Sequence, residues 1–314
     1  MAAQKPFDVV GIGCCAVDML AIVDPFPQPD QKVQVQDLTQ QGGGLVSTGL
    51  VAVARLGGKA RYLGKLGDSE LADYARHEFQ REGVDISGVL TEPGKSVLFS
   101  YVVVTPSTGT RTIFVAMKQK PEYRAADLKR EEVLSGRFLF VDGFEMEAAL
   151  QAARWATADG IKVVMDAEFV FEQTDELVAL SDYIIASLDF AQLKTQEREP
   201  RAAARALYRQ QKDLKPDKVV IVTAGTRGSF GVSADGEFHQ PAFVVEVVDT
   251  TGAGDVYHGA FIYALAQGWD VRQCARFASA VAALKCRKLG GRAGIPTRRE
   301  VDAFLAGNPK TYPA

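Results

Sequence analysis

The sequence is poor in cysteine and histidine, with four and three of these residues among 314. Cys14 and Cys15 are adjacent, and the spacing of Cys274 and Cys286 is unlike that of a zinc site. These positions therefore predict neither a disulfide framework nor a zinc centre. Reduced thiols are the simplest expectation, and they favour a cytoplasmic location.

Long apolar runs and an excess of basic residues are also missing. No run approaches the roughly 18 apolar residues of a membrane span, and the chain enters a strand-like stretch almost at once. The formal charge is −3, and the most basic stretch, 285–299, is interrupted by glycines. We therefore expect neither a signal peptide, nor a membrane span, nor nucleic-acid binding.

The hydrophobic content of 47% is enough for one large α/β domain or two small ones. Strand-like and helix-like stretches alternate from Phe138 onward, which predicts a mostly parallel sheet with helices on both faces. Such sheets bind ligands beyond the carboxyl ends of their strands. Other β-rich runs, at 97–104 and 111–117, could form a small separate sheet with residues 16–38, where Lys32 to Gln36 alternate like a strand.

The chain is organised around the stretch Val-Asp-Thr-Thr-Gly-Ala-Gly-Asp at 248–255. An apolar run at 243–248 predicts a strand, and residues 260–266 predict a helix. Gly252, Ala253 and Gly254 then lie at the joint, where unpaired amides at a helix N-terminus can bind an anion. Asp255 follows in the first helical turn, where its carboxylate can take a proton from an attacking hydroxyl. The stretch therefore predicts phosphoryl transfer.

These seven residues, 249–255, resemble the second signature of the ribokinase (PfkB) family of carbohydrate kinases. The resemblance implies a single ribokinase-like α/β domain over residues 1–314, with a β-sheet lid built from about 16–38 and 97–117. It also implies an ATP-dependent sugar kinase that uses Mg²⁺. Asp255 would be the catalytic base, and the amides of Gly252, Ala253 and Gly254 would form the anion hole.

The sugar side of the site is implied by a second resemblance, to the first family signature. Asp18 matches a family Asp that binds sugar hydroxyls, and Gly43 and Gly44 match a Gly-Gly pair that packs against the sugar. Ser47 stands where the family usually has Asn, and its shorter reach leaves the sugar preference open. Lys32 and Arg111 are the obvious cations for a charged substituent on the sugar.

The nucleotide side resembles the family at Thr223, Gly225 and Gly228, which match Thr-x-Gly-x-x-Gly, and at Ser279. The family's Asn-x-x-Glu, which helps to hold Mg²⁺, is replaced by Ser187 and Phe190, with Asp189 one residue early. Either Asp189 compensates, or the phosphates and water hold most of the Mg²⁺, so its protein ligands are unknown. The family also implies a K⁺ site made by backbone carbonyls around Asp249 and Thr251 and in the loop near 290.

Several alternatives remain beside this interpretation. Residues 11–16 match a dinucleotide fingerprint, but the β-rich stretch that follows leaves no room for the required helix, so nicotinamide binding is disfavoured. His258 is expected to pack against a neighbouring element or to face solvent rather than to relay protons.

The substrate is also open. The region 244–296 is most similar to the fructokinase-like and sulfofructose-kinase branch, and the apolar Val115 and Phe144 favour an uncharged ketose-like sugar. Sulfofructose kinase, ribokinase and nucleoside kinase are alternatives within the family, and a sugar- or nucleotide-binding protein that is catalytically weak is an alternative of another class. The family also implies a homodimer formed through the lid.

Overall fold

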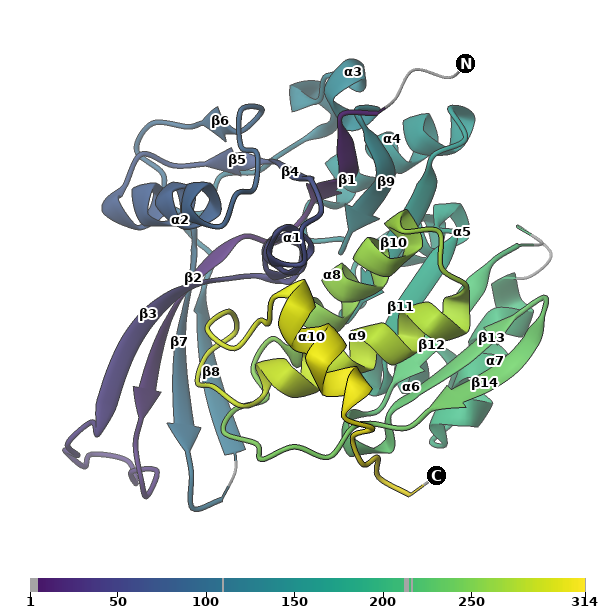
Figure 1. The fold of residues 1–314 in the computed structure, drawn as a ribbon. Coiled ribbons are helices and arrows are strands. Elements are labelled where there is room, and N and C mark those ends of the chain that lie inside the picture. Colours follow the sequence, from purple (N-terminus) through teal and green to yellow (C-terminus); the bar gives the residue numbers. More distant parts are fainter. Residues whose placement is uncertain (1–4, 109, 212–214, 216, 314) are drawn as a thin grey trace.

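A large sheet covered by helices forms the body of the molecule, and a smaller sheet projects from it (Figure 1). The structure, a computed structural model, describes residues 5–108, 110–211, 215 and 217–313, so Gly109 of the expected lid lies outside the described residues. The strands of the large sheet are β1 (Phe7–Ile12), β4 (Ala60–Leu63), β9 (Gly136–Val141), β10 (Lys162–Ala167), β11 (Tyr183–Ser187), β12 (Val219–Thr223), β13 (Ser229–Ser233) and β14 (Gly236–Gln240).

Within these residues the strand order is β14-β13-β12-β11-β10-β9-β1-β4. The strands from β4 to β12 run parallel, and β13 and β14 add an antiparallel edge. Successive side chains enter opposite cores: Val9 packs in one and Val10 in the other. The prediction of a mostly parallel sheet buried on both faces is confirmed.

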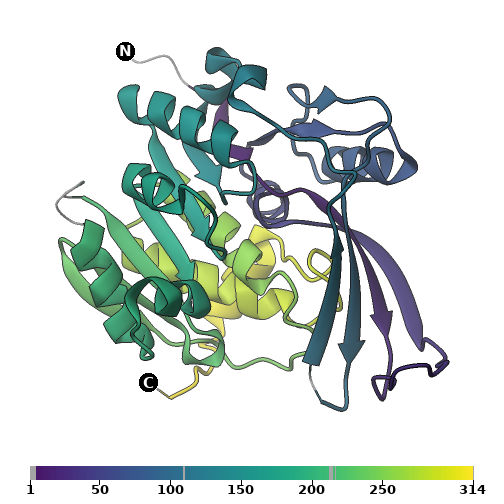
Figure 2. The same ribbon diagram turned by 180° about the vertical axis from the view of Figure 1, so that it is seen from behind.

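Helices occupy both faces of this sheet. One face carries α1 (Leu45–Arg55), α8 (Ala253–Ala266), α9 (Val271–Lys285) and α10 (Arg298–Ala306), as Figure 1 shows. The other carries α4 (Met146–Ala158), α5 (Thr174–Leu180), α6 (Leu188–Thr195) and α7 (Pro200–Gln211), seen in Figure 2. Helix α8 is buried at every residue from Val256 to Ala266, because it lies between α1, α9 and the sheet. This packing fixes the position of Asp255 at its start.

The smaller sheet has the order β3-β2-β7-β8, with β2 (Ala16–Ile22), β3 (Asp37–Gly43), β7 (Leu98–Thr105) and β8 (Thr110–Ala116). One of its faces is turned toward the body, where Leu20, Val102 and Val104 pack against Leu289. Asp18 lies on that same face, opposite Gln41 and Ser100 in the neighbouring strands. The lid expected from two separated parts of the chain is therefore one continuous sheet.

Shorter elements complete the fold. Strands β5 (Lys65–Leu66) and β6 (Leu90–Thr91) pair with each other beside α2 (Glu70–Arg81), which Ser69 caps. A 3-10 turn η1 (Ala125–Asp127) and α3 (Arg130–Val133) lead into β9, and η2 (Gly225–Arg227) joins β12 to β13. No helix within the described ranges combines the length and the apolar character needed to cross a bilayer.

Two predicted strands are wrong. Residues 32–36 form an irregular segment whose alternating Val33 and Val35 are 44% and 37% exposed, because no partner strand covers them. Residues 243–248 contain only an isolated bridge from Phe243 to Thr311. Phe243, Val245 and Val247 instead line a cavity, whereas Val244 and Val248 are exposed.

Candidate active site

The start of α8 has the geometry of an anion site. Gly252 is its N-cap residue with φ of 72°, and a Cβ there would lie 2.9 Å from the Cα of Gly291. Only glycine fits such a position without strain. The Ala253 amide donates to the Thr250 carbonyl at 3.1 Å, so the Gly252 and Gly254 amides are the ones left available among the described backbone bonds. A Cβ on Gly254 would meet nothing within 4 Å, so open space lies in front of it.

Asp255 stands in the first turn of α8 with its side chain partly exposed. Among the described residues no hydrogen bond to its carboxylate is found. Burial raises its pKa well above the usual range, and the charge of Asp166 raises it further. Asp18 also contributes to this rise, so the carboxyl groups of the lid and of α8 lie within electrostatic reach of one another.

Asp249 organises the loop that leads into the anion site. Its Oδ1 accepts from the amide and the hydroxyl of Thr251 at 2.9 and 2.8 Å, and its Oδ2 accepts from the Gly290 amide at 2.7 Å. The backbone carbonyl of Asp249 accepts from Nζ of the buried Lys285 at 2.9 Å. The carbonyl implied as a K⁺ ligand therefore already has a cationic partner.

A mainly apolar cavity of about 350 Å³ adjoins the anion site. It brings together the residues predicted for the nucleotide, namely Thr223, Gly225, Gly228, Ser279 and Gly254. Tyr257, Ala282, Ala283 and Tyr312 complete much of the wall. A pocket of this size and apolar character suits a planar base.

Ser187 lies outside that wall but pairs with Thr223 at the ends of β11 and β12. Its hydroxyl caps α6 by accepting from the Phe190 amide at 3.1 Å. Phe190 is fully buried in the core, and Asp189 is exposed in the first turn of α6. Phe190 therefore fills a hydrophobic position.

On the lid side, Asp18 is in close contact with the glycine turn, residues 42–44, which leads from β3 into α1. Asp18 is only 8% exposed, and a Cβ on Gly43 would lie 2.1 Å from its Oδ2. Gly44 is the N-cap residue of α1 with φ of 91°. The Ser47 hydroxyl is fully buried, and it donates to the carbonyls of Gly43 and Gly44 while accepting from Arg292. Ser47 thus supports the glycine turn from behind.

The two predicted lid cations lie in different surroundings. Arg111 on β8 extends to the loop before α8, and its Nη1 donates to the Thr250 hydroxyl at 2.9 Å. This contact brings a guanidinium from the lid beside the anion site. Lys32 lies in the exposed irregular segment before β3, and no side-chain contact joins it to the other predicted residues within the described chain.

His258 is buried inside the protein. Of the two placements expected from the sequence, packing against a neighbouring element is therefore the one found. Its Nδ1 lies 2.6 Å from the Gly254 carbonyl and its Nε2 lies 3.0 Å from the Ile185 carbonyl. Asp166 approaches the same ring, with Oδ2 3.4 Å from Nδ1. That Oδ2 is buried and has no hydrogen-bond partner among the described residues. Asp166, at the carboxyl end of β10, was not predicted from the sequence.

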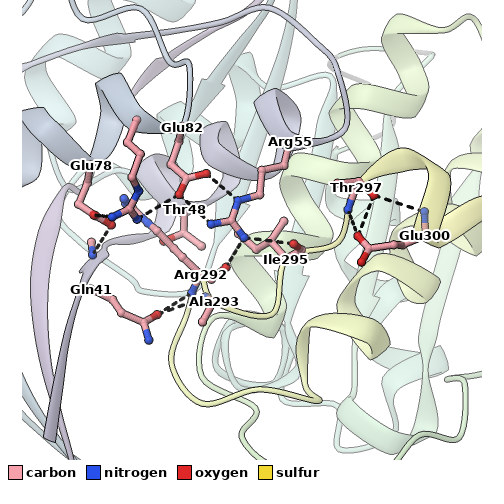
Figure 3. Close-up of polar contacts among 12 residues, drawn as sticks. Gln41, Thr48, Arg55, Glu78, Glu82, Arg292, Ala293, Ile295, Thr297 and Glu300 are labelled. Carbon is pink, nitrogen blue, oxygen red and sulfur yellow. Dashed lines mark hydrogen bonds and ion pairs between the residues drawn. The ribbon is translucent and has the colours of Figure 1, made fainter.

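Arg292 is another buried group that was not predicted from the sequence. It is 2% exposed, and its guanidinium donates to the Gly43 carbonyl and to the hydroxyls of Ser47 and Thr48 at 3.0–3.3 Å. Its own backbone is held by Gln41 and Arg55, and Arg55 pairs in turn with Glu82 (Figure 3). This arginine joins the loop near 290 to the glycine turn of the lid.

An α/β sheet with an anion site, an acidic side chain and a lid on one edge defines an enzyme of the phosphoryl-transfer class. The profile described as "pfkB family carbohydrate kinase" matches residues 7–298. The chain belongs to this family and is a sugar kinase.

Relatives match over nearly the whole length. Ketohexokinase of Mus musculus is 26% identical over 289 residues, covering 88% of this chain and 95% of that protein. Ribokinase of Haemophilus influenzae is 26% identical over 301 residues, covering 94% and 97%. The structure of Arabidopsis thaliana ribokinase complexed with ribose and ATP superposes with a TM-score of 0.80 at 22% identity, covering 95% and 98%.

Proposed function

We propose that this chain transfers the γ-phosphate of ATP to a primary hydroxyl of a ketose-like sugar, with Asp255 as the general base. One observation carries the proposal: the Asp255 carboxylate, free of protein hydrogen bonds in the described chain, stands beside the open amides of Gly252 and Gly254. Gly254 lies in the wall of the mainly apolar cavity, and the Asp18 carboxyl, in contact with Gly43, lies within electrostatic reach of Asp255. Two substrates can therefore meet there.

The chemistry follows from these positions. Asp255 accepts the hydroxyl proton as the sugar oxygen attacks the γ-phosphorus, and ADP leaves in line with the attack. The Gly252 and Gly254 amides donate to the oxygens that gain negative charge. Arg111, which is hydrogen-bonded to Thr250, adds a positive charge beside these amides.

Mg²⁺ fits one group of this chain. The buried Asp166 Oδ2 lacks a protein hydrogen bond among the described residues and is a hard oxygen ligand, which Mg²⁺ prefers. Asp166 would hold the ion directly or through water, and the ion would neutralise charge on the phosphate oxygens.

The residues at the base of the lid favour an uncharged sugar. Cys14, Ala16 and Leu98 form an apolar cluster with Leu45 and Phe144 at the base of the lid. Of the two cations that the sequence predicted for a charged substituent, Arg111 is directed to Thr250 and Lys32 lies in the exposed segment. Hydroxyl recognition then falls to Asp18, whose carboxylate accepts hydrogen bonds.

A second candidate is a sugar that carries a phosphate or sulfonate. A cavity of about 790 Å³ at the base of the lid includes Phe144 in its wall and is rich in cations, namely Lys65, Lys95, Lys118, Lys120 and Arg124. Lys65, Lys120 and Arg124 are paired with carboxylates. Lys95 and Lys118 have no such partner within the described residues, so they could meet an anionic substituent.

ATP consumption across a panel of ketoses, pentoses, nucleosides and phospho- or sulfosugars tests both candidates. We expect the highest kcat/KM with a free ketose. A preference for the anionic sugars would select the second candidate. Failure of every acceptor, with ATP still bound in a thermal-shift assay, would instead favour a binding protein of this fold.

Gly254→Ala tests the open space in front of the amides. The methyl group meets no protein atom, so the melting temperature should change by less than about 2 °C. It would project toward the transferring phosphate, so turnover should fall about ten-fold or more. Gly307→Ala at the end of α10 is the control. Unchanged turnover in Gly254→Ala would place the phosphate elsewhere.

A homodimer through the lid is part of the proposal. All residues of the edge strand β8 are exposed, and Ile113, Phe114 and Val115 are 45%, 55% and 55% exposed. Long apolar edges of this kind usually pair with another chain. Phe114→Glu should weaken dimerisation at least ten-fold, because one buried aromatic ring contributes about 2 kcal/mol.

Light scattering at micromolar concentration measures this change, and Leu193→Glu on α6 is the control for an exposed apolar residue elsewhere. A wild-type protein that is only monomeric would contradict the proposed dimer.

A cytoplasmic location also remains a proposal, supported by four free and buried cysteines.

A further inference from the structure

Lys285 is a buried cation beside the anion site. It is the last residue of α9, its exposure is 0%, and its Nζ donates to the backbone carbonyl of Asp249 at 2.9 Å. Within the described chain this is its only hydrogen bond, and no carboxylate lies within 4.0 Å of it. A buried ammonium is costly unless nearby groups compensate its charge. An apolar side chain would fill this position at lower cost.

The compensating charge belongs to Asp249. Burial lowers the pKa of Lys285 and the charge of Asp249 opposes that shift, while Lys285 helps to lower the pKa of Asp249. The Asp249 carboxylate meanwhile holds Thr251 and the Gly290 amide. The ammonium thus fixes the carbonyl of a residue whose side chain shapes the turn before Gly252.

We propose that the Lys285 ammonium takes the place of a bound monovalent cation, so that this kinase works without K⁺. The inference rests on the proposed function, in which the 252–254 turn binds the transferring phosphate. The carbonyls around Asp249 and Thr251 are those that K⁺ would need. One of them already binds an ammonium, which has one positive charge and needs the same carbonyl oxygens. A second cation at this point would meet a like charge in a poorly hydrated place.

Another buried lysine shows what a structural role looks like. Lys218 is also 0% exposed, and its Nζ donates to the carbonyls of Val178 and Ala179 at 2.7 and 3.1 Å. Those carbonyls belong to the last turn of α5, where cations commonly cap helices. Lys285 instead binds a loop carbonyl six positions before Asp255. Lys218 is therefore the matched control.

The first experiment uses the wild-type enzyme with its preferred sugar in chloride salts of K⁺, Na⁺ and tetramethylammonium at constant ionic strength. Turnover should agree within about two-fold among the salts, and the melting temperature should not rise in K⁺ relative to tetramethylammonium. Ten-fold activation by K⁺, or a K⁺-specific rise in melting temperature, would overturn the proposal. The comparison of melting temperatures does not depend on turnover, so it still tests K⁺ binding if no sugar is phosphorylated.

The second experiment uses Lys285→Ala, which leaves room for an ion, and Lys285→Met, which fills the space without charge. In tetramethylammonium both should lose roughly ten- to hundred-fold in turnover. K⁺ should restore activity and raise the melting temperature of Lys285→Ala and do neither for Lys285→Met. Lys218→Met should melt earlier and stay insensitive to K⁺.

Full activity of Lys285→Ala in every salt would also refute the cation role. If Lys285→Ala fails to fold in tetramethylammonium, recovery of its folding in K⁺ supports the role. If Lys285→Ala folds in neither salt, Lys285→Gln is tested instead. We expect K⁺ to restore the activity of Lys285→Gln, and a lack of this rescue would contradict the proposal.

Discussion

Replacing Asp255 with Asn should lower turnover by roughly two to four orders of magnitude while the fold stays intact. The amide matches the carboxylate in shape but cannot accept the hydroxyl proton. No protein hydrogen bond to the carboxylate is found in the described chain, so the substitution removes little that supports the structure. Steady-state kinetics with the preferred sugar measures the loss, and thermal shift with ATP shows whether the nucleotide still binds.

The pH profile gives a second test of the same residue. Burial and then Asp166 raise the pKa of Asp255, and the base works only when it is ionised. Activity should therefore fall as the pH drops through the raised pKa, well above the value of about 4 for an ordinary carboxyl group. Measured in kcat at saturating sugar, this acid limb should disappear from the residual activity of Asp255→Asn.

Asp73→Asn is a suitable control for that variant. Asp73 also lies in the first turn of a helix, but its side chain is exposed and pairs with Arg76. Its replacement should leave both turnover and the acid limb in place. Near-normal turnover in Asp255→Asn would remove this residue from the role of base.

Local signals in the sequence were sufficient to predict the turn and the helix at the centre of the candidate site. The glycines at 252 and 254 and the apolar helix after them encode a strained turn and a buried helix, and both depend mainly on neighbouring residues. The same logic failed for the strand at 32–36, because alternation describes a strand only when a partner covers one face. The real strand, β3, ends in glycines that strands usually avoid. A Cβ at Gly42 would lie 2.0 Å from Nη1 of Arg292, so a side chain there would displace this guanidinium from its buried hydrogen bonds.

The missed residues share a non-local cause. Arg292 lies among loop glycines, Lys285 at the end of an amphipathic helix, and Asp166 at the end of a strand, and each position is commonly solvated. Their burial arises only when the loop near 290 meets the lid and α8 meets β10. Periodicity and motif spacing carry no information about such contacts.

Arg292→Met should impair both stability and sugar binding. The change leaves the Gly43 carbonyl and two hydroxyls without their buried donor, and losses of about 3–5 kcal/mol are usual when one member of a buried charged network is removed. Because the guanidinium lies behind the glycine turn, the KM for sugar should rise by roughly ten-fold or more, with a smaller change in the KM for ATP. Arg299→Met, on the exposed side of α10, is the control.

A shift in the pH profile separates positioning from simple destabilisation. Burial raises the pKa of Asp18, and the charge of Arg292 opposes that rise. Without Arg292 the Asp18 carboxyl stays protonated to higher pH, so the acid limb of kcat/KM for sugar should move upward. Arg292→Lys keeps the charge and should move it less, although its single ammonium cannot reproduce the fork of bonds to Gly43, Ser47 and Thr48. If Arg292→Met melts earlier yet keeps the sugar KM and the acid limb of the wild type, then Arg292 contributes only to stability, and the coupling between the loop near 290 and the sugar turn is absent.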